Sequence, residues 1–271
     1  MNENIIECSA LPERGCWFVA AENRDYLVVA KGSGLPSAPL NGGELSVFEQ
    51  VAESFPDVMN VNGKKEGEGG LIHRIDAETC GLLLIARNGE FFQRIQECRN
   101  NGRFLKTYTA YSVICDGEYG ELPKNCKITS RFRPYGKKGA AVKPVFEESG
   151  MADKKKAGSR LYTTEIVDSE VVFRKDGQNL VRLICRIEEG FRHQVRAHLA
   201  YSGFPVFGDA LYNKKFSGDS TVPYDMMFFA SGLSFEETDG SVTSVLIPKK
   251  LMDQKVQKAQ KAINAFTSLT R

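Results

Sequence analysis

The chain has few residues that bind metal ions or build disulfide frameworks. It contains only three histidines, and its seven cysteines form no C-x-x-C pair. This spacing does not support a zinc site or a redox dithiol, and an odd, scattered set of cysteines is typical of a reducing cytoplasm. We therefore predict a cytoplasmic protein that binds no metal ion.

Long apolar runs and leader signals are also missing. The longest run of hydrophobic residues, Cys16 to Ala21, has six residues, whereas a transmembrane helix needs about 20. Residues 1–4 lack the basic and apolar segments of a signal peptide. The sequence Gly32-Ser33-Gly34 is not followed by the spacing of a P-loop or a dinucleotide-binding loop. We expect no membrane contact and no nucleotide cofactor, so redox and phosphoryl-transfer chemistry are poorly supported.

Positive charge is concentrated in one segment of an otherwise ordinary globular composition. The 271 residues are 42% hydrophobic and 26% charged, with a formal net charge of only +2. Residues 124–160 nevertheless contain eleven lysines and arginines against three acidic residues. Such a segment either binds a polyanion or forms a solvated loop, and its charge alone favours the solvated loop.

Strand patterns outnumber helix patterns and do not alternate regularly with them. This order predicts an α+β fold with a large mixed, mainly antiparallel sheet and flanking helices. The predicted strands are residues 26–30, 82–86, 104–114, 161–167, 171–174, 180–188, 226–230 and 241–247. The predicted helices are residues 44–55, 90–99, 190–202 and 249–269.

We expect one catalytic domain that spans residues 1–271. Its core would cover about residues 17–247, with a basic insertion at 124–160 and a C-terminal helix at 249–269 that carries an apolar stripe. The basic insertion is the only place where a domain boundary could fall. Neither side of it looks able to fold alone.

A compact polar cluster, His73-Arg74-Ile75-Asp76, stands directly before the apolar run at residues 82–86. A carboxylate at the edge of a core element needs a partner or a function, because burying an unpaired charge is costly. Asp76 is therefore either paired with Arg74, which shares its face in extended backbone, or a nucleophile or general base. Glu78 could complete a glycosidase-like acid pair, but a solvated turn residue is favoured.

A second cluster of charged residues covers residues 188–198. On a helix that begins at Gly190, Arg192 and Arg196 lie one turn apart on one face, with His193 beside them. Such a helix start could bind phosphate. The alternative is a set of surface ion pairs with the neighbouring Glu188 and Glu189.

Four motifs in order resemble the RluA-type pseudouridine synthase family over about residues 17–247. Three positions depart from its pattern: Ile75 replaces leucine, Cys80 replaces serine, and residues 228–230 read Phe-Phe-Ala instead of Leu-His-Ala. Some relatives carry an S4-like RNA-binding domain in front of the core, and we expect none before Trp17. The motifs are His73 to Leu83, Lys106-Thr107-Tyr108, Gly190 to His198 and Gly203 to Tyr212.

This resemblance implies the pseudouridine synthase fold with a central RNA-binding cleft. It also implies the isomerisation of specific uridines in rRNA or tRNA to pseudouridine without a cofactor. Asp76 would be the catalytic nucleophile or base, and Arg196 would pair with it and keep it ionised. Tyr108 would stack on the target base and assist a proton transfer.

The resemblance also implies RNA contacts, and it favours reading the basic segment as an RNA-contacting arm. We expect the protein to be a monomer. Arg74 would occupy the gap left when the uridine is flipped out, and Leu199 would line the pocket. One alternative is a catalytically inactive RNA-binding protein on the same fold, and another is a hydrolase that uses Asp76 and Glu78. The remaining predicted substrate or RNA contacts are His73, Arg192, His193, Lys137 and Lys138.

Overall fold

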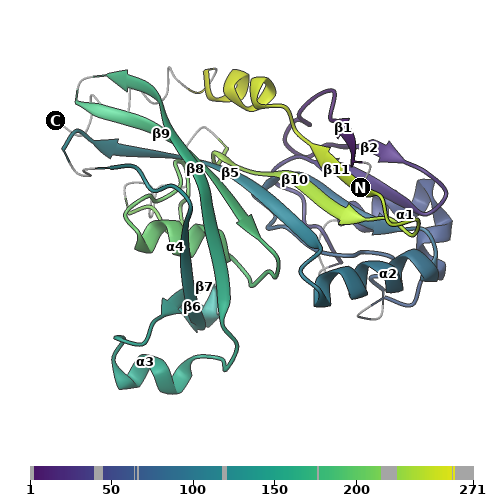
Figure 1. Cartoon of the computed structure of the whole chain (residues 1–271), viewed down its shortest axis with the longest axis horizontal. Coiled ribbons are helices and arrows are strands. Elements are labelled where there is room, and N and C mark those ends of the chain that lie inside the picture. The colour runs from purple at the N-terminus through teal and green to yellow at the C-terminus, as the bar shows by residue number, and fades with distance from the viewer. Residues whose placement is uncertain are drawn as a thin grey trace. The chain divides into compact units, whose positions relative to one another are not determined.

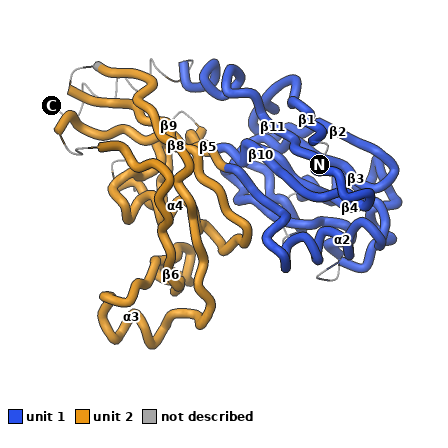
Figure 2. The backbone as a smooth tube through the Cα atoms, in the orientation of Figure 1, with its two compact units in different colours: residues 1–107, 229–257 blue, residues 108–228, 258–271 orange. Residues whose placement is uncertain are grey.

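The computed structural model of the chain describes residues 3–39, 45–63, 65, 67–117, 121–175, 177–214, 225–257 and 259. The chain divides into two units, coloured separately in Figure 2. Unit 1 contains residues 1–107 and 229–257, and unit 2 contains residues 108–228 and 258–271. The division falls inside a strand, and not in the basic segment where the sequence allowed a boundary. The prediction of a single catalytic domain stays a prediction.

The predicted α+β class is confirmed, because strands dominate both units and helices flank them (Figure 1). Unit 1 contains β1 (Glu3–Glu7), β2 (Trp17–Glu22), β3 (Tyr26–Lys31), α1 (Val47–Ser54), η1 (Pro56–Asn60), β4 (Cys80–Ala86), α2 (Gly89–Asn100), the start of β5 (Phe104–Cys115), β10 (Phe228–Glu236) and β11 (Val242–Leu246). Unit 2 contains the rest of β5, β6 (Cys126–Tyr135), η2 (Lys137–Gly139), β7 (Ala141–Val145), α3 (Met151–Lys156), β8 (Tyr162–Lys175), β9 (Gln178–Ile187) and α4 (Gln194–Tyr201).

The sheet of unit 1 is mixed. Its strands follow the order β2-β3-β4-β10-β5, and β11 and β1 extend it from β10. The pairs β2–β3, β3–β4 and β10–β11 are antiparallel, whereas β4–β10 and β1–β11 are parallel. All residues of β3 and β4 are buried, as expected for strands covered on both faces.

Gly81 shows why β4 can lie so close to β10. It pairs with Ala230 in the parallel register, and its φ is +145°. A Cβ at this position would lie 2.3 Å from the Ala230 carbonyl oxygen, so a side chain would push the two strands apart. The sequence needs glycine here to keep the buried strand in place.

Helices α1 and α2 follow sequence signals closely. Ser46 caps α1 in a capping box with Glu49, in which each side chain bonds the other residue's backbone N–H. Asn88 caps α2 by accepting from the Phe91 N–H at 2.9 Å. Both predicted helices are thus confirmed, with small shifts at their ends, and α2 packs Phe91, Phe92, Ile95 and Cys98 into the core.

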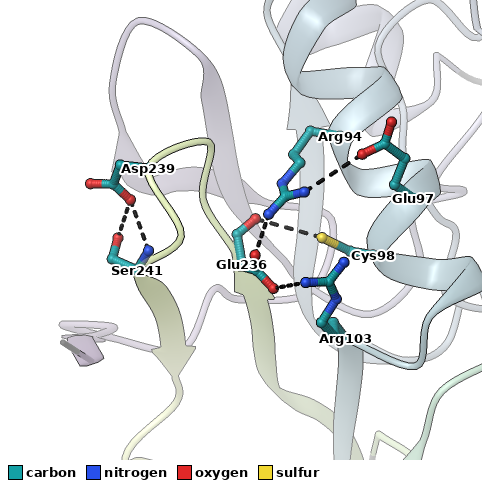
Figure 3. A network of polar contacts seen from close by, with 7 residues as sticks. All are labelled: Arg94, Glu97, Cys98, Arg103, Glu236, Asp239 and Ser241. Carbon is teal, nitrogen blue, oxygen red and sulfur yellow. Dashed lines mark hydrogen bonds and ion pairs between the residues drawn. The ribbon is translucent and has the colours of Figure 1, made fainter. Parts of the chain in front are cut away.

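A polar network fastens α2 to the end of β10 (Figure 3). Glu236 accepts hydrogen bonds from Arg94 and, at 2.5 Å, from Arg103. Arg94 also forms an ion pair with Glu97, and the Cys98 thiol donates to the Glu236 carbonyl oxygen. One carboxylate is shared by two guanidinium groups, so the end of β10 is bonded to α2 through Arg94 and to the segment after α2 through Arg103.

In unit 2 the strands follow the order β5-β9-β8-β6-β7, and the pairs β8–β9, β6–β8 and β6–β7 are antiparallel. Two short strands around Asp168-Ser169 were predicted, and this prediction is wrong. A single strand, β8, covers residues 162–175, and bulges interrupt its pairing with β9 at two places. Ser169 pairs with Leu183 within the ladder, while Asp168 forms an ion pair with Lys124. These polar residues are paired within the ladder, directly after a bulge, and form no turn.

The basic segment is folded and is not a loop. It forms the antiparallel pair β6–β7, the turn at η2 and the short helix α3, which lies beyond the strand ends in Figure 1. At the C-terminal end, residues 249–257 are helical, and Met252 and Val256 are buried. The remainder of the predicted apolar stripe, Ile263 and Phe266, lies outside the described residues. No helix within the described ranges is long and apolar enough to cross a membrane.

Candidate functional site

Asp76 lies in a loop of unit 1 that leads directly into β4. The Thr79 N–H donates to the Asp76 carbonyl oxygen at 3.0 Å and closes a turn before β4 begins. The side chain of Asp76 is partly exposed, while Ile75 before it is buried. The predicted position of this acid, at the edge of a buried strand, is therefore confirmed.

The upstream part of the loop is fixed by pairing with the far end of β4. The Ala86 N–H donates to the Gly70 carbonyl oxygen at 2.8 Å, and the Ile72 N–H donates to the Leu84 carbonyl oxygen at 3.0 Å. A Cβ on Gly70 would lie 1.9 Å from the Ala86 oxygen. Glycine is required here for the same reason as in β4, because two backbones approach closely.

The side chain of His73 also bonds to the backbone of β4. Its Nε2 accepts the Leu84 N–H at 3.2 Å, and its ring lies 5.6 Å from that of Phe104. A nitrogen that accepts an N–H carries no proton, so this ring is the neutral tautomer with its proton on Nδ1. His73 is 7% exposed and has a structural role, and its contact with RNA stays a prediction.

Lys31 holds the backbone just after Asp76. Its fully buried ammonium group donates to the carbonyl oxygens of Gly32, Leu35 and Ala77 at 2.8–2.9 Å. Burial lowers the pKa of Lys31 from 10.5 to about 8, so the group is still protonated at neutral pH. Three protons therefore match three acceptors, and one of these acceptors adjoins Asp76.

Ser37 holds the backbone just before Asp76. Its hydroxyl donates to the Ile75 carbonyl oxygen at 2.6 Å and accepts the Ile75 N–H at 3.1 Å. Sequence reasoning assigned no role to Lys31 or Ser37. A usable signal was the lysine that ends an otherwise apolar strand, because a charge at a buried position requires partners.

The charged neighbours of Asp76 have other partners. Arg74 forms an ion pair with Glu68, at 3.4 Å, and the alternative of a structural Arg74–Asp76 pair stays a prediction. Glu78 is exposed on the turn and pairs with Arg14 at 2.8 Å, as expected of a solvated turn residue. Because Glu78 is held by Arg14, the glycosidase-like acid pair with Asp76 is not supported.

Tyr108 belongs to unit 2 and is 8% exposed. Its ring stacks on that of Phe228, with centroids 5.2 Å apart and an angle of 9° between the planes. Phe228 is one of the positions at which the sequence departs from the Leu-His-Ala pattern. One face of Tyr108 is therefore covered by an aromatic ring. Its stacking on a target base stays a prediction.

Helix α4 begins at Gln194, four residues later than predicted. His193 precedes it in the left-handed conformation, with a φ of 55°, so Arg192 and Arg196 do not share a helix face. The predicted joint phosphate site on that face is wrong. The predicted pairs with Glu188 and Glu189 are also not observed, since Glu189 pairs with Arg160.

Arg196 is instead locked into a buried pair with Asp209. Its Nε and Nη2 each donate to one carboxylate oxygen of Asp209 at 2.8 Å. Arg196 is 7% exposed and Asp209 is 1% exposed. Its guanidinium also lies over the Tyr212 ring, 5.2 Å from the centroid. Bidentate pairing fixes both the position and the orientation of the guanidinium. Asp209 and Tyr212 were given no role from sequence, although they belong to one of the recognised motifs.

The residues before α4 contact the β6–β7 pair. Arg192 Nη2 donates to the Gly139 carbonyl oxygen at 2.5 Å, and His193 Nδ1 shares a hydrogen bond with the Tyr212 hydroxyl at 3.0 Å. Leu199 is fully buried, and its place in a substrate pocket stays a prediction. Lys137 and Lys138 are exposed on the η2 turn.

His198 lies in the interior of unit 2. Its ring nitrogens bond the hydroxyls of Ser130, at 2.8 Å, and Thr164, at 2.9 Å. Its ring also packs on Phe132, with centroids 4.9 Å apart. Burial lowers the pKa of His198 from 6.5 to about 3, so it is neutral at physiological pH. Within the described ranges, no group of three or more His, Cys, Asp or Glu side chains could hold a metal ion.

The predicted site residues thus fall in both units. Asp76 belongs to unit 1, whereas Tyr108 and Arg196 belong to unit 2. The predicted pairing of Asp76 with Arg196 stays a prediction.

Comparison with known proteins identifies the family. The family model for RNA pseudouridylate synthase matches residues 25–201. A Bacillus subtilis protein, an uncharacterized RNA pseudouridine synthase, is 26% identical over 199 residues, which are 72% of this chain and 57% of that protein. A Yersinia pestis protein, ribosomal large subunit pseudouridine synthase D, is 24% identical over 201 residues, which are 72% of this chain and 52% of that protein.

Two solved human structures share the fold. They are RNA Pseudouridylate Synthase Domain Containing 1 and 4, with TM-scores of 0.60 and 0.58 and identities of 21% and 17%. They cover 92% and 88% of this chain, and 96% and 92% of their own chains are matched. The chain belongs to the RNA pseudouridylate synthase family. It spans a little over half the length of the two bacterial relatives.

Proposed function

We propose that this protein isomerises selected uridines in RNA to pseudouridine, with Asp76 as the nucleophile or general base. The loop around Asp76 supports this most directly. Ser37 bonds the backbone of Ile75 and Lys31 bonds that of Ala77, while the Asp76 side chain keeps partial exposure. Backbone held on both sides of an accessible carboxylate is suited to a reacting group that must be oriented before the reaction.

The chemistry needs no external reactant. The bond from ribose C1′ to uracil N1 breaks, the base turns, and a bond forms from C1′ to C5. C5 loses one proton and N1 gains one, so the numbers of atoms and electrons in the substrate are unchanged. Asp76 would either attack the nucleotide or remove a proton, and Arg196 would favour its ionised form. Tyr108 would stack on the base.

RNA contacts would come from exposed cations. The Arg74 side chain is 54% exposed and bonded only loosely, at 3.4 Å, to Glu68. It is therefore available to occupy the gap left by a flipped uridine, a step that costs a few kcal/mol. Lysines of the β6–β7 region would bind phosphates without regard to sequence.

Ribosomal RNA is the first candidate target, and transfer RNA is the second. The support is the name of the Yersinia pestis relative, which assigns that protein to the large ribosomal subunit. The aligned region is only 52% of that longer protein, so the target is assigned here as a proposal.

Mapping pseudouridine at single-nucleotide resolution tests this function. Total RNA would be compared from cells with the gene, without it, and with the Asp76→Asn variant restored. We expect one or a few sites to be lost without the gene and to stay absent with the variant. If every site persists in all RNA classes, the isomerase proposal is contradicted and the inactive RNA-binding alternative is favoured.

A further inference from the structure

The turn between β6 and β7 has an unusual backbone. Gly136, Lys138 and Gly139 all have positive φ values, of 78°, 53° and 68°. Glycine adopts this conformation freely, but a lysine does so against steric resistance. Lys138 adopts it nevertheless, and strained backbone of this kind clusters at functional positions.

The turn presents two lysines and a tyrosine together. Lys137 and Lys138 are exposed, and the neighbouring Tyr135 ring is 38% exposed. Neither lysine forms an ion pair with any residue that the structure describes. Cations near an exposed aromatic ring are the combination that binds single-stranded nucleic acid, through phosphates and stacked bases.

Four other cations of the basic segment form ion pairs. Arg133 and Lys143 both pair with Asp153, at 2.6 and 2.8 Å. Arg131 pairs with Glu147 at 3.1 Å, and Lys154 lies 3.8 Å from the same carboxylate. These pairs fasten α3 and the loop before it to the strands. The cations that they use are less available to a ligand.

Arg192 holds the turn through hydrogen bonds to its backbone. Its Nη2 donates to the carbonyl oxygens of Gly139, at 2.5 Å, and Ala141, at 3.4 Å. The Val142 N–H, one residue further, donates to the Tyr212 hydroxyl at 2.9 Å. The same Tyr212 ring lies under the guanidinium of Arg196. One set of contacts therefore positions both the double-lysine turn and the predicted catalytic arginine.

An apolar cluster that joins β6, β7 and α4 supports the turn. Phe132 and Val142 pack with Ala197 of α4, and Phe191 stacks on Phe132 with centroids 5.0 Å apart and planes at 8°. The strands that carry the turn are therefore fixed by packed apolar side chains. A prearranged site loses less conformational entropy when it binds its ligand.

We propose that the turn Gly136–Ala140 is a preformed site for the RNA backbone, in which Lys137 and Lys138 bind phosphates and Arg192 acts as a positioning residue. This inference rests on the proposed action on RNA and names the part of the protein that holds the substrate. Arg192, predicted as an RNA contact, acts here through the turn and not on the ligand.

Salt dependence of binding tests the two lysines. The probe is a fluorescein-labelled RNA hairpin with a uridine-rich loop, titrated by anisotropy over a range of KCl concentrations. Each lost phosphate contact lowers the slope of log Kd against log salt concentration by about 0.7–0.9. We expect Lys137→Ala/Lys138→Ala to lower it by about 1.4–1.8. The control, Lys155→Ala/Lys156→Ala, removes equal charge from exposed positions of α3 and should change the slope by less than half as much.

A double-mutant cycle tests Arg192. Arg192→Ala should weaken binding several-fold in the wild-type background and have little further effect in the Lys137→Ala/Lys138→Ala background, because it acts through the turn. Additive losses would mean that Arg192 binds RNA itself and would overturn its positioning role. Thermal unfolding of each variant confirms that the unit remains folded.

The outcomes separate this inference from the proposed activity. A wild-type slope in the lysine variant, equal effects in the α3 control, or no binding of the hairpin by wild-type protein would overturn the turn as a binding site. Pseudouridine formation, assayed in parallel, tests the activity on its own. A lowered slope in a protein that forms no pseudouridine would support the turn and contradict the isomerase.

Discussion

The two charged residues proposed for catalysis are held in different ways. Asp76 stands on a loop whose backbone is bonded on either side by Lys31 and Ser37, and its carboxylate keeps partial exposure. Arg196 is held by its own guanidinium, in a buried bidentate pair with Asp209. The first arrangement fixes the backbone on either side of a partly exposed side chain. The second makes the side chain part of the core.

This difference separates function from stability. A change at Asp76 should remove activity and leave the fold intact, because Lys31 and Ser37 hold the loop through the backbone on either side of it. A change at the Arg196–Asp209 pair should damage both, because removing one partner leaves a buried charge without compensation. Substitutions in each region can therefore be ranked by their expected cost.

The largest stability loss is expected for Asp209→Ala. It leaves the Arg196 guanidinium buried without its carboxylate, which typically costs about 3–5 kcal/mol. Urea unfolding measures this loss. The matched control is Asp153→Ala, which removes a carboxylate also bonded by two cations, Arg133 and Lys143, but near solvent. If both variants lose equal stability, burial of the Arg196 pair is not what stabilises unit 2.

A smaller loss, with a specific effect on activity, is expected for Lys31→Met. The variant keeps the length of the side chain but removes the donor for three backbone carbonyl oxygens. We expect about 2–4 kcal/mol of destabilisation. Each buried acceptor left unpaired costs about 1–3 kcal/mol, but part of this sum is offset because the variant no longer buries an ammonium charge. Activity should fall further than the folded fraction does, because the backbone beside Asp76 is released.

The control for this variant is Lys155→Met, on the exposed face of α3. It should leave stability and the turnover rate unchanged. If Lys31→Met loses stability but retains the wild-type turnover rate under conditions where it is folded, Lys31 does not position Asp76.

The smallest effect concerns pH and His198. The pKa of this histidine in the folded protein, about 3, lies below its usual value of 6.5. Between these values the unfolded chain binds a proton that the folded chain does not, so the free energy of unfolding falls as the pH is lowered. The slope approaches about 1.4 kcal/mol per pH unit for one proton.

A His198→Gln variant tests this dependence. Glutamine does not titrate, so the variant should lose less stability than the wild type between pH 6.5 and pH 5, whatever its stability at neutral pH. Urea unfolding at several pH values gives both curves. Parallel curves would show that His198 is already accessible to protons in the folded state.

The sequence predicts the parts of the fold whose signals are local. Buried runs such as β4, and helices with side-chain caps such as α2, lie close to their expected positions because hydrophobic pattern and capping determine them. The sequence predicts two strands where the structure has only β8, because Asp168-Ser169 resembles a turn. A bulged strand tolerates these residues because Lys124 and the ladder provide partners for them.

The candidate site was predicted in part. Asp76, Tyr108 and Arg196 came from motif resemblance, which gives identity but not partners. The pairing of Arg196 with Asp209, and the left-handed His193 that delays α4, depend on contacts between segments far apart or on backbone geometry that no periodicity records. The division of the chain within β5 has no local signal, because the strand continues through it.

Activity of the Asp76→Asn variant tests the central claim most directly. Purified wild-type protein, Asp76→Asn and the control Glu78→Gln would each be incubated with the RNA in which the mapping experiment has located the target uridine. Pseudouridine formation and RNA affinity would then be measured. We predict that Asp76→Asn forms no detectable pseudouridine but binds RNA within about threefold of wild type, a difference below about 0.7 kcal/mol. Glu78→Gln, which loses only an exposed ion pair with Arg14, should stay fully active. Pseudouridine formed by Asp76→Asn at the wild-type rate would contradict the account.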